Sequence, residues 1–512
     1  MQKIKSDRSI LTIILTVSLI NFLIYIITTA FFSYGIFRDE LYYIACANQL
    51  DFGYVDHPPL SIAVLAFWKF LFGDSMFVIR LVPAIISSAT IFMIGLFTAR
   101  LGGGKIAVLI STVVLMLTPV FLGMNTIYSM NVFDYLFWIT SAYIFLRIIQ
   151  EENKRLWIIL GIVLGLGLLN KTSMIWLCAG IFIGILLTPL RKELKSKYPY
   201  IAAAIALIIF SPFIIWNFTH DFAHLEFMRN AANRKYDELT PISFILDQIL
   251  ILNPGSVLLW LSGIFFFFFS KTGKKYRAPG FIWLTTFVIL VINWHSKGEY
   301  IAAGYQILFA GGAVMLEEWS LIRHREWIKY VVVVPLVLTG ILIVPFARPL
   351  LPPEKFLEYQ DFVGLKSPVN EGIETTMPQF YSDMFGWEKM AKKVSDVYLT
   401  IPEKERETTV VYCNNYGKAG AVEYYSKKYP LPKVVCPHNN YWYWWDEVKN
   451  PTTIIIIGGN LEDHLSSLEQ VDSVAAYKTR YVMPYENNFT IFIGRGFKRS
   501  VKEIRNSDKV FI

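Results

Sequence analysis

Apolar segments of about 20 residues recur from the start of the chain to residue 346, and short polar connections separate them. A helix of that length crosses roughly 30 Å of hydrocarbon, so each segment predicts a membrane span. The pattern therefore predicts an α-helical polytopic membrane protein. About eleven transmembrane helices are expected, near residues 10–32, 77–99, 106–123, 131–149, 156–170, 174–189, 200–217, 247–269, 279–294, 300–316 and 328–346.

The composition agrees with a membrane protein. Of 512 residues, 54% are apolar and 17% are charged, and the mean hydropathy is +0.44, whereas soluble proteins carry roughly a quarter charged residues. The 16% aromatic content excludes a disordered chain, and 4 cysteines exclude a disulfide scaffold. Cys413 and Cys436 are expected in an oxidising compartment, where a bridge between them and two free thiols remain equal alternatives.

The net charge of +8 lies entirely in residues 1–346, because residues 347–512 carry equal numbers of acidic and basic residues. We therefore predict two domains: a transmembrane domain over 1–346 and a soluble domain over 347–512. Basic residues concentrate in alternate connections, so the positive-inside rule puts the N-terminus in the cytoplasm. The first loop (33–76), the loop near 217–246 and the 347–512 domain then face outward from the cytoplasmic membrane. No nucleic-acid partner is expected.

The C-terminal segment has the pattern of a small α/β domain. Residues 408–412 and 452–457 predict buried strands, and 419–429 predicts a helix between them. The aromatic run at 441–445 fits either stacking on a carbohydrate or resting on the bilayer surface.

The first outer loop is rich in acidic residues. Residues 39–50 predict a short amphipathic helix lying on the bilayer, with Asp39 at its start. Asp39 and Glu40 fit a simple capping pair. The alternative is a cluster that faces water or a polar ligand, because so many polar groups beside a membrane are otherwise costly. The other members of that cluster are Tyr42, Tyr43, Asp56 and His57.

The run FRDELYYIACANQLDFGYVDHPPL in this loop resembles the first periplasmic loop of bacterial GT-C superfamily glycosyltransferases, the group of protein O-mannosyltransferases and lipid A aminoarabinose transferases. YSMNVFDYLFW (128–138), GLGLLNKTS (165–173) and KGEYIAAGY (297–305) are similar to the same family. NYGKAGA (415–421) and HNNYWYW (438–444) resemble the C-terminal part of one bacterial subgroup. The resemblance implies a GT-C fold and a PMT-like glycosyltransferase.

Members of this family move a sugar from a polyprenyl-phosphate carrier to an acceptor hydroxyl at the outer membrane face, usually with inversion. The resemblance implies that Asp39 is the general base, and that Glu40 orients it or binds sugar hydroxyls. The acceptor is expected to be a glycan, a lipid or a protein. The implied substrate-binding residues are Arg38, Tyr42, Tyr43, Asp56, His57, Arg80, Asn131, Asp134, Lys171, Lys297 and Tyr300.

Three cations in that set, Arg80, Lys171 and Lys297, map to the outer side against the positive-inside bias. Each is a candidate ligand of the lipid phosphate, and interfacial snorkelling is the alternative. Tyr300 is expected to donate to the same phosphate. Asp134 either replaces the acid that relatives carry at the position of Asn131, or pairs with a buried cation.

His220 and His224 have the i, i+4 spacing of a zinc helix, but no third ligand is visible in the sequence, and a surface helix is favoured. No required cofactor is predicted, and a divalent metal stays open. The alternative function is a lipid-linked sugar flippase or transporter, which would place ionisable groups near the bilayer midplane.

Overall fold

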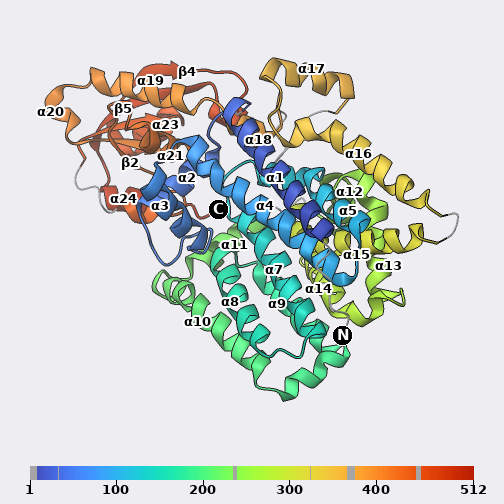
Figure 1. Cartoon of the computed structure of the whole chain (residues 1–512). Coiled ribbons are helices and arrows are strands. Elements are labelled where there is room, and N and C mark those ends of the chain that lie inside the picture. The colour runs from blue at the N-terminus through green and yellow to red at the C-terminus, as the bar shows by residue number, and fades with distance from the viewer. Residues whose placement is uncertain (1–7, 33, 235–238, 323–324, 366–374, 446–450) are drawn as a thin grey trace.

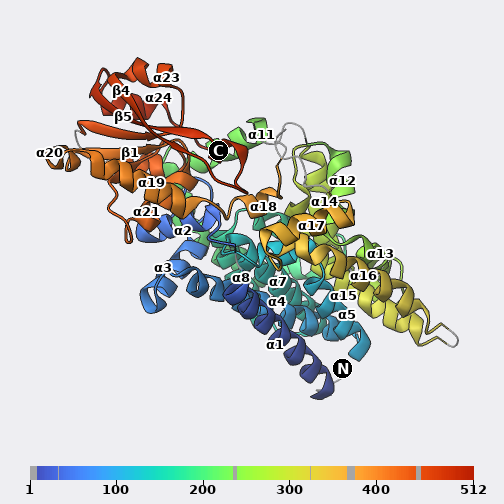
Figure 2. The same cartoon turned by 90° about the horizontal axis from the view of Figure 1, so that it is seen from above.

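The computed structural model describes residues 8–32, 34–234, 239–322, 325–365, 375–445 and 451–512. A bundle of helices forms the larger part of the molecule, and a smaller domain with a β-sheet lies at one end of it (Figure 1, Figure 2). The predicted helical, polytopic architecture with a small C-terminal α/β domain is confirmed.

All of the predicted apolar segments are helical. Seven helical segments among the described residues are long and apolar enough to span a membrane, and nine if each of two bent pairs is one span. The seven are α1 (Arg8–Phe31), α4 (Met76–Leu101), α7 (Met130–Gln150), α10 (Tyr198–Thr219), η3 with α14 (Gly273–Tyr276 and Arg277–Ile292), η4 with α15 (Gly298–Ile301 and Ala302–Ser320) and α16 (Ile328–Ala347).

The remaining predicted segments are bent or short. One bent pair joins α9 (Met174–Leu186) to η1 (Pro189–Lys195) at 101°, and the other joins α12 (Pro241–Ile251) at 92° to η2 and α13 (Pro254–Ser256 and Val257–Phe268). Three apolar helices have only 10–17 residues: α3 (Leu60–Phe72), α5 (Lys105–Met116) and α8 (Arg155–Asn170). Two of these, α5 and α8, account for the difference between nine and the expected number of spans.

The bundle has a buried centre and an apolar exterior. In the most apolar stretch of the segment that contains α15, 89% of the residues are buried, whereas in the corresponding stretches of α10 and α16 only 22% are buried. Large apolar side chains such as Ile208 and Leu338 are 70% and 64% exposed on these outer helices. Such an exterior is costly in water and suits lipid, where every backbone group is already bonded inside a helix.

The first outer loop folds into α2 (Arg38–Asn48) and α3. The helix predicted over 39–50 therefore exists, but the expectation that it lies on the bilayer is wrong. Leu41, Tyr42 and most of the other α2 residues are buried, and α2 packs against α21 (Tyr416–Tyr425) of the C-terminal domain. Protein covers α2 because its apolar side chains join one core with those of the C-terminal sheet domain.

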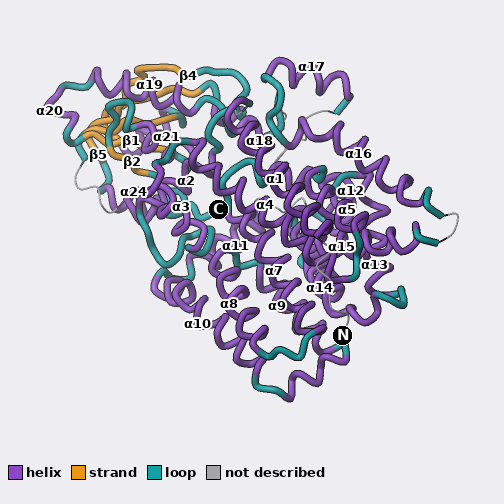
Figure 3. Tube along the Cα trace, viewed as in Figure 1, coloured by secondary structure: helices purple, strands orange, loops and turns teal. Residues whose placement is uncertain are grey.

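The C-terminal domain contains a five-stranded sheet in the order β2-β1-β3-β5-β4 (Figure 3). β1 (Thr409–Cys413) pairs in parallel with β2 (Lys433–Val435) and β3 (Thr453–Ile457), and β5 (Phe489–Phe497) runs antiparallel to β3 and β4 (Leu468–Tyr477). The predicted strands correspond to β1 and β3. The surrounding helices are α18 (Gln379–Ser382), α19 (Trp387–Thr400), α20 (Glu403–Arg406), α21, α22 (Tyr441–Trp444), α23 (Leu461–Ser467), η6 (Pro484–Glu486) and α24 (Val501–Ser507).

The described elements also include three further helices: α6 (Pro119–Met124), α11 (Ala223–Arg234) and α17 (Pro353–Val363).

Cys413 and Cys436 are both buried and free, so of the two alternatives left by the sequence the structure shows free thiols.

Candidate active site

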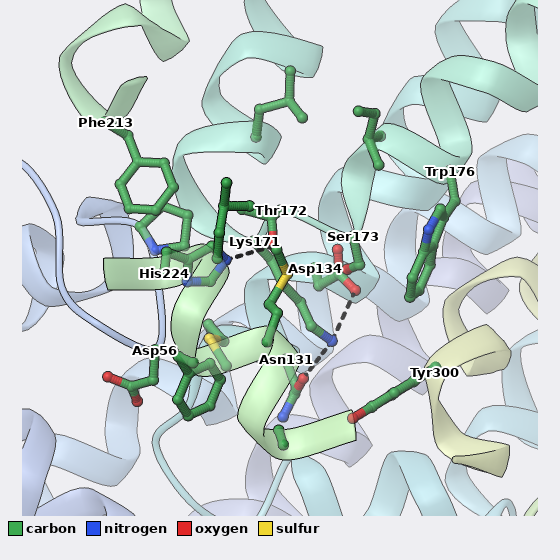
Figure 4. Close-up of a pocket in the computed structure, with 18 of the residues that line it drawn as sticks. Asp56, Asn131, Asp134, Lys171, Thr172, Ser173, Trp176, Phe213, His224 and Tyr300 are labelled. Carbon is green, nitrogen blue, oxygen red and sulfur yellow. Dashed lines mark hydrogen bonds and ion pairs between the residues drawn. The ribbon is translucent and has the colours of Figure 1, made fainter. Parts of the chain in front are cut away.

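A cavity of about 810 Å³ lies between one end of the bundle and the C-terminal domain. It collects most of the predicted site residues from five separate parts of the chain (Figure 4). These are Asp39, Tyr42, Tyr43, Asp56, Asn131, Asp134, Lys171, Lys297 and Tyr300. Arg38, Glu40, His57 and Arg80 are not part of this lining, although Arg38 contacts Tyr416 and His57 contacts Asp56, which are.

Asp39 lies in the first turn of α2 and is partly buried in the cavity wall. The phenol of Tyr416, in α21 of the C-terminal domain, donates a hydrogen bond of 2.8 Å to Asp39 Oδ1. The guanidinium of Arg38 lies 4.6 Å from the centre of the Tyr416 ring. Burial, together with the nearby Asp39 carboxylate, raises the pKa of the Tyr416 phenol well above its usual value, so this phenol remains a donor.

Asp56 is the second carboxylate that the first loop contributes. Its Oδ1 accepts a hydrogen bond of 2.9 Å from the phenol of Tyr42. The His57 ring is fully buried next to it, with Nδ1 3.0 Å from the Pro58 carbonyl oxygen and Nε2 3.9 Å from Asp56 Oδ2. His57 therefore fixes the turn that presents Asp56 to the cavity.

Glu40 and Arg80 form a buried ion pair. Arg80 Nε and Nη2 donate to the two carboxylate oxygens at 2.9 and 2.7 Å, and both side chains are 1% exposed. The same carboxylate accepts from the backbone N–H groups of Phe37 and Tyr128, at 2.9 and 2.8 Å. This geometry favours a structural role for Glu40 and Arg80, because their charges are already satisfied by each other and by the backbone.

Lys171 lies between Asn131 and Asp134 of α7 (Figure 4). Its ammonium donates to Asn131 Oδ1 at 2.8 Å and is 3.6 Å from Asp134 Oδ2. Of the two alternatives for Asp134, the ion pair with a cation is the one observed. The Lys171 side chain keeps 18% exposure whereas Asp134 keeps 4%, so the ammonium is the member of the pair that a ligand can reach.

Figure 4 shows the Trp176 and Tyr300 side chains on one side of Lys171 and its partners Asn131 and Asp134. Phe213 and His224 lie on the other side. The ring centres of Trp176 and Tyr300 are 6.2 Å apart. Lys297 and Glu299 line the same part of the cavity from the segment before α15. Charged groups of both signs thus meet at this end, on the outer side of the predicted topology.

The rest of the lining is mainly apolar and comes from α9, α10 and α11. Ile175, Phe218 and Leu225 are 61%, 65% and 53% exposed, so the apolar wall is continuous with the exterior of the bundle. The other members of this wall are Phe210, Phe213, Ile214, Phe222, Phe227 and Met228. One cavity therefore combines a polar end with a surface that suits a hydrocarbon chain.

The two histidines with zinc-like spacing have separate partners. His224 Nδ1 lies 2.9 Å from the Val55 carbonyl oxygen and Nε2 lies 3.3 Å from Thr172 Oγ1, while the His220 ring stacks on Trp216. Burial lowers the pKa of His224, which favours the neutral ring. Across the described part of the chain, no three His, Cys, Asp or Glu side chains are grouped closely enough to hold a metal ion.

Sequence reasoning missed the contribution of the C-terminal domain to the cavity. Tyr416 and Asn439 line it, and they come from the two C-terminal runs that resemble a bacterial subgroup. Those runs were the available signal, but nothing in the sequence brings residue 416 next to residue 39.

The aromatic run at 441–445 lies partly in the core and partly at the surface. Tyr441 and Trp445 are buried, and Trp442 and Tyr443 pack around Phe511. Trp442, Tyr443 and Trp444 are partly exposed, so stacking on a carbohydrate and resting on the bilayer both stay predictions for these three rings.

The fold and this cavity belong to a polytopic membrane protein, and comparisons with known proteins confirm the resemblance to GT-C, PMT-like glycosyltransferases that was found in the sequence. Residues 56–216 match a family model described as dolichyl-phosphate-mannose-protein mannosyltransferase. Lipid A galacturonosyltransferase RgtD of Rhizobium johnstonii is 22% identical over 299 residues, which are 57% of this chain. The match spans 62% of that relative's length.

Solved structures share the fold across nearly the whole chain. The crystal structure of ArnT from Cupriavidus metallidurans bound to undecaprenyl phosphate has a TM-score of 0.59 at 11% identity, covering 94% of this chain and 97% of ArnT. An oligosaccharyltransferase from Archaeoglobus fulgidus, tethered with an acceptor peptide, has a TM-score of 0.50 at 12% identity, covering 98% and 75%. At these identities the likeness concerns the fold alone.

Proposed function

We propose that this protein transfers a sugar from a polyprenyl-phosphate-linked donor to an acceptor hydroxyl at the outer face of the cytoplasmic membrane. One observation carries the proposal: a single cavity contains Asp39 and Asp56, the ammonium groups of Lys171 and Lys297, and an apolar wall. A lipid-linked donor needs these three features together, for the acceptor proton, the phosphate and the carrier chain respectively.

In the proposed reaction, the acceptor hydroxyl is deprotonated by the Asp39 carboxylate as its oxygen bonds to the anomeric carbon of the sugar. The bond between that carbon and the phosphate oxygen breaks, and its electron pair leaves with the polyprenyl phosphate. Attack from the face opposite the leaving phosphate inverts the anomeric centre. Asp56 is suited to hold sugar hydroxyls, because Tyr42 already fixes one of its oxygens.

Lys171 is the better placed of the two candidate phosphate ligands. Negative charge develops on the departing phosphate, and an ammonium aimed at it stabilises the transition state. Asn131 and Asp134 hold Lys171 in place before the substrate binds, so little reorganisation is needed. Lys297 and Tyr300 complete this end of the cavity. The ArnT structure with undecaprenyl phosphate bound supports a lipid phosphate as the carrier, and RgtD supports a glycan or lipid acceptor.

The test is incubation of the purified protein with a panel of polyprenyl-phosphate hexoses, mannose included, followed by measurement of the free carrier lipid. Asp39→Asn removes the base and keeps the side-chain shape, so carrier release should fall about 10²- to 10⁴-fold. Asp74→Asn is the matched control, because Asp74 belongs to the same loop and pairs with Lys427 at the surface.

Equal release by the wild type and Asp39→Asn would contradict Asp39 as the base. Absence of release from every donor, combined with carrier-linked sugar moving across proteoliposomes, would replace the transferase by the flippase alternative.

A further inference from the structure

The C-terminal domain bonds directly to Asp39 and reaches Asp56 through other residues. Tyr416 donates directly to Asp39 Oδ1 at 2.8 Å. Asn440 acts on Asp56 through two intermediates: its Oδ1 accepts from the backbone N–H of Val55 at 2.7 Å, and its own backbone N–H donates to the Tyr42 phenol oxygen at 3.4 Å. Tyr42 in turn donates to Asp56 Oδ1. Tyr42 and Asn440 are 1% and 2% exposed, so these contacts lie in the interior.

The packing of α21 explains how Tyr416 reaches Asp39. Gly417 and Gly420 face α2, and a Cβ at these positions would lie 2.8 Å from Arg38 Cγ and 3.0 Å from the Leu41 carbonyl carbon. Only glycine allows so close an approach of the two helices. The run at 415–421 is thus a contact surface for α2, and the Tyr416 hydroxyl lies at its end beside the cavity.

A second contact fixes the domain on the other side of the cavity. Lys509 forms an ion pair of 2.7 Å with Glu226, and Asn230 donates to the Phe511 carbonyl oxygen at 2.9 Å. Both partners are in α11, which supplies part of the apolar wall. The C-terminal domain is therefore held against two elements that line the site, α2 and α11.

We propose that Tyr416 and Asn440 are positioning residues, and that the C-terminal domain completes the active site by orienting Asp39 and Asp56. The proposal rests on the proposed function. Tyr416 holds one oxygen of the Asp39 carboxylate in a fixed direction, which leaves the carboxylate plane aligned with the cavity. Asn440 holds Tyr42 and the backbone before Asp56, which fixes the second carboxylate.

Asp39 is surrounded by several other titratable groups that share in its electrostatic environment. Arg38 and Tyr43 are nearest on α2 itself, and Asp383 lies on the side of the C-terminal domain. The remaining charged and titratable side chains of the cavity are Tyr42, Asp56, Asp134, Tyr135, Lys171, His224, His295, Lys297, Glu299 and Tyr300. Tyr416→Phe leaves all of these side chains in the sequence, so a change in the pH profile of this variant reports the lost hydrogen bond.

The first test is Tyr416→Phe, which removes the hydroxyl and keeps the ring under Arg38. A hydrogen bond donated to a carboxylate favours its charged form. We expect kcat to fall about tenfold to a hundredfold, the acid limb of the pH–rate profile to move to higher pH, and the KM for the donor to stay unchanged. Tyr424→Phe is the matched control, because Tyr424 is on the same helix and donates to the Asp74 carbonyl oxygen, away from the cavity.

The second test is Asn440→Ala, which removes the acceptor for the Val55 N–H. We expect kcat to fall while the KM for the donor stays unchanged. Thermal unfolding of all variants separates a folding defect from a catalytic one.

If Tyr416→Phe releases the carrier at the wild-type rate and with the wild-type pH profile, this inference is overturned and the proposed function stays intact. No release by the wild type would instead reject the proposed function.

Discussion

Asp383 is a buried carboxyl at the boundary between the first loop and the C-terminal domain. Its backbone carbonyl accepts from the Arg38 N–H at 3.0 Å, and its Oδ1 has no hydrogen-bond partner among the described residues. Burial raises the pKa of Asp383 from 3.8 to about 7, against the opposing effect of Arg38. The folded protein thus keeps this proton at pH values where the unfolded chain has released it.

This proton makes stability depend on pH. Between pH 3.8 and about 7 the unfolded state binds fewer protons at Asp383, so the free energy of unfolding should fall as pH rises, by at most about 1.4 kcal/mol per unit. We expect Asp383→Asn to lack this loss, so that its Tm exceeds the wild-type Tm at pH 8 and does not at pH 4. The exposed Asp396→Asn in α19 is the control, and an equal difference in Tm at both pH values would contradict the prediction.

Individual residues also show which parts of the candidate site can be predicted from the sequence. Asp39, Asp56 and Lys171 carry their own signals, namely a motif or a charge on the side where the positive-inside rule does not expect it. Arg80 carries the same charge signal, but whether a cation binds a ligand or a buried carboxylate depends on its partner in the fold. Tyr416 lies in a run that resembles a bacterial subgroup, but the run does not reveal its contact with Asp39, because the two residues are 377 positions apart.

At the level of elements, the Glu40–Arg80 pair joins α2 to α4 and to the start of α7. Arg80→Met leaves a carboxylate buried without its cation, and such a loss typically costs about 3–5 kcal/mol. The double variant Arg80→Met with Glu40→Gln removes that charge and keeps a carbonyl acceptor for the N–H of Tyr128. We therefore expect the double variant to be more stable than Arg80→Met alone in thermal unfolding. The opposite order would show that the pair is not the main stabilising contact here.

Element boundaries show a second limit of the sequence pattern. Residues 247–269 look like one continuous span, but the chain turns at Asn253, where φ is +76°, and Pro254 cannot continue a helix from it. The Asn253 amide donates to the carbonyl oxygens of Leu117 and Leu336 at 2.9 and 3.0 Å. Hydropathy predicts which segments are apolar enough to lie in a membrane. A bend within such a segment depends on hydrogen-bond partners from distant parts of the chain, which bond to the backbone groups that the bend leaves open.

At the scale of the whole molecule, the position of the cavity ties its chemistry to one side of the membrane. The polar end lies beside the C-terminal domain, at the outer end of the bundle in the predicted topology, and the apolar wall leads from it onto the exterior of α10. In the proposed function, a lipid-linked sugar enters sideways from the bilayer and an acceptor approaches from the aqueous side. This division holds only if the C-terminal domain is outside the cytoplasm.

Orientation is therefore the prediction on which the others depend. Ser466 in α23 is exposed on the C-terminal domain, and Lys192 in η1 is exposed in a basic connection that the positive-inside rule assigns to the cytoplasm. In bacterial spheroplasts, a membrane-impermeant maleimide should label Ser466→Cys at once and Lys192→Cys only after the membrane is permeabilised. The native thiols give a low background, because Cys46, Cys413 and Cys436 are buried and Cys178 is partly buried in α9. The reverse labelling order would put Asp39 and the cavity on the cytoplasmic side, where a carrier presented at the outer face could not reach them.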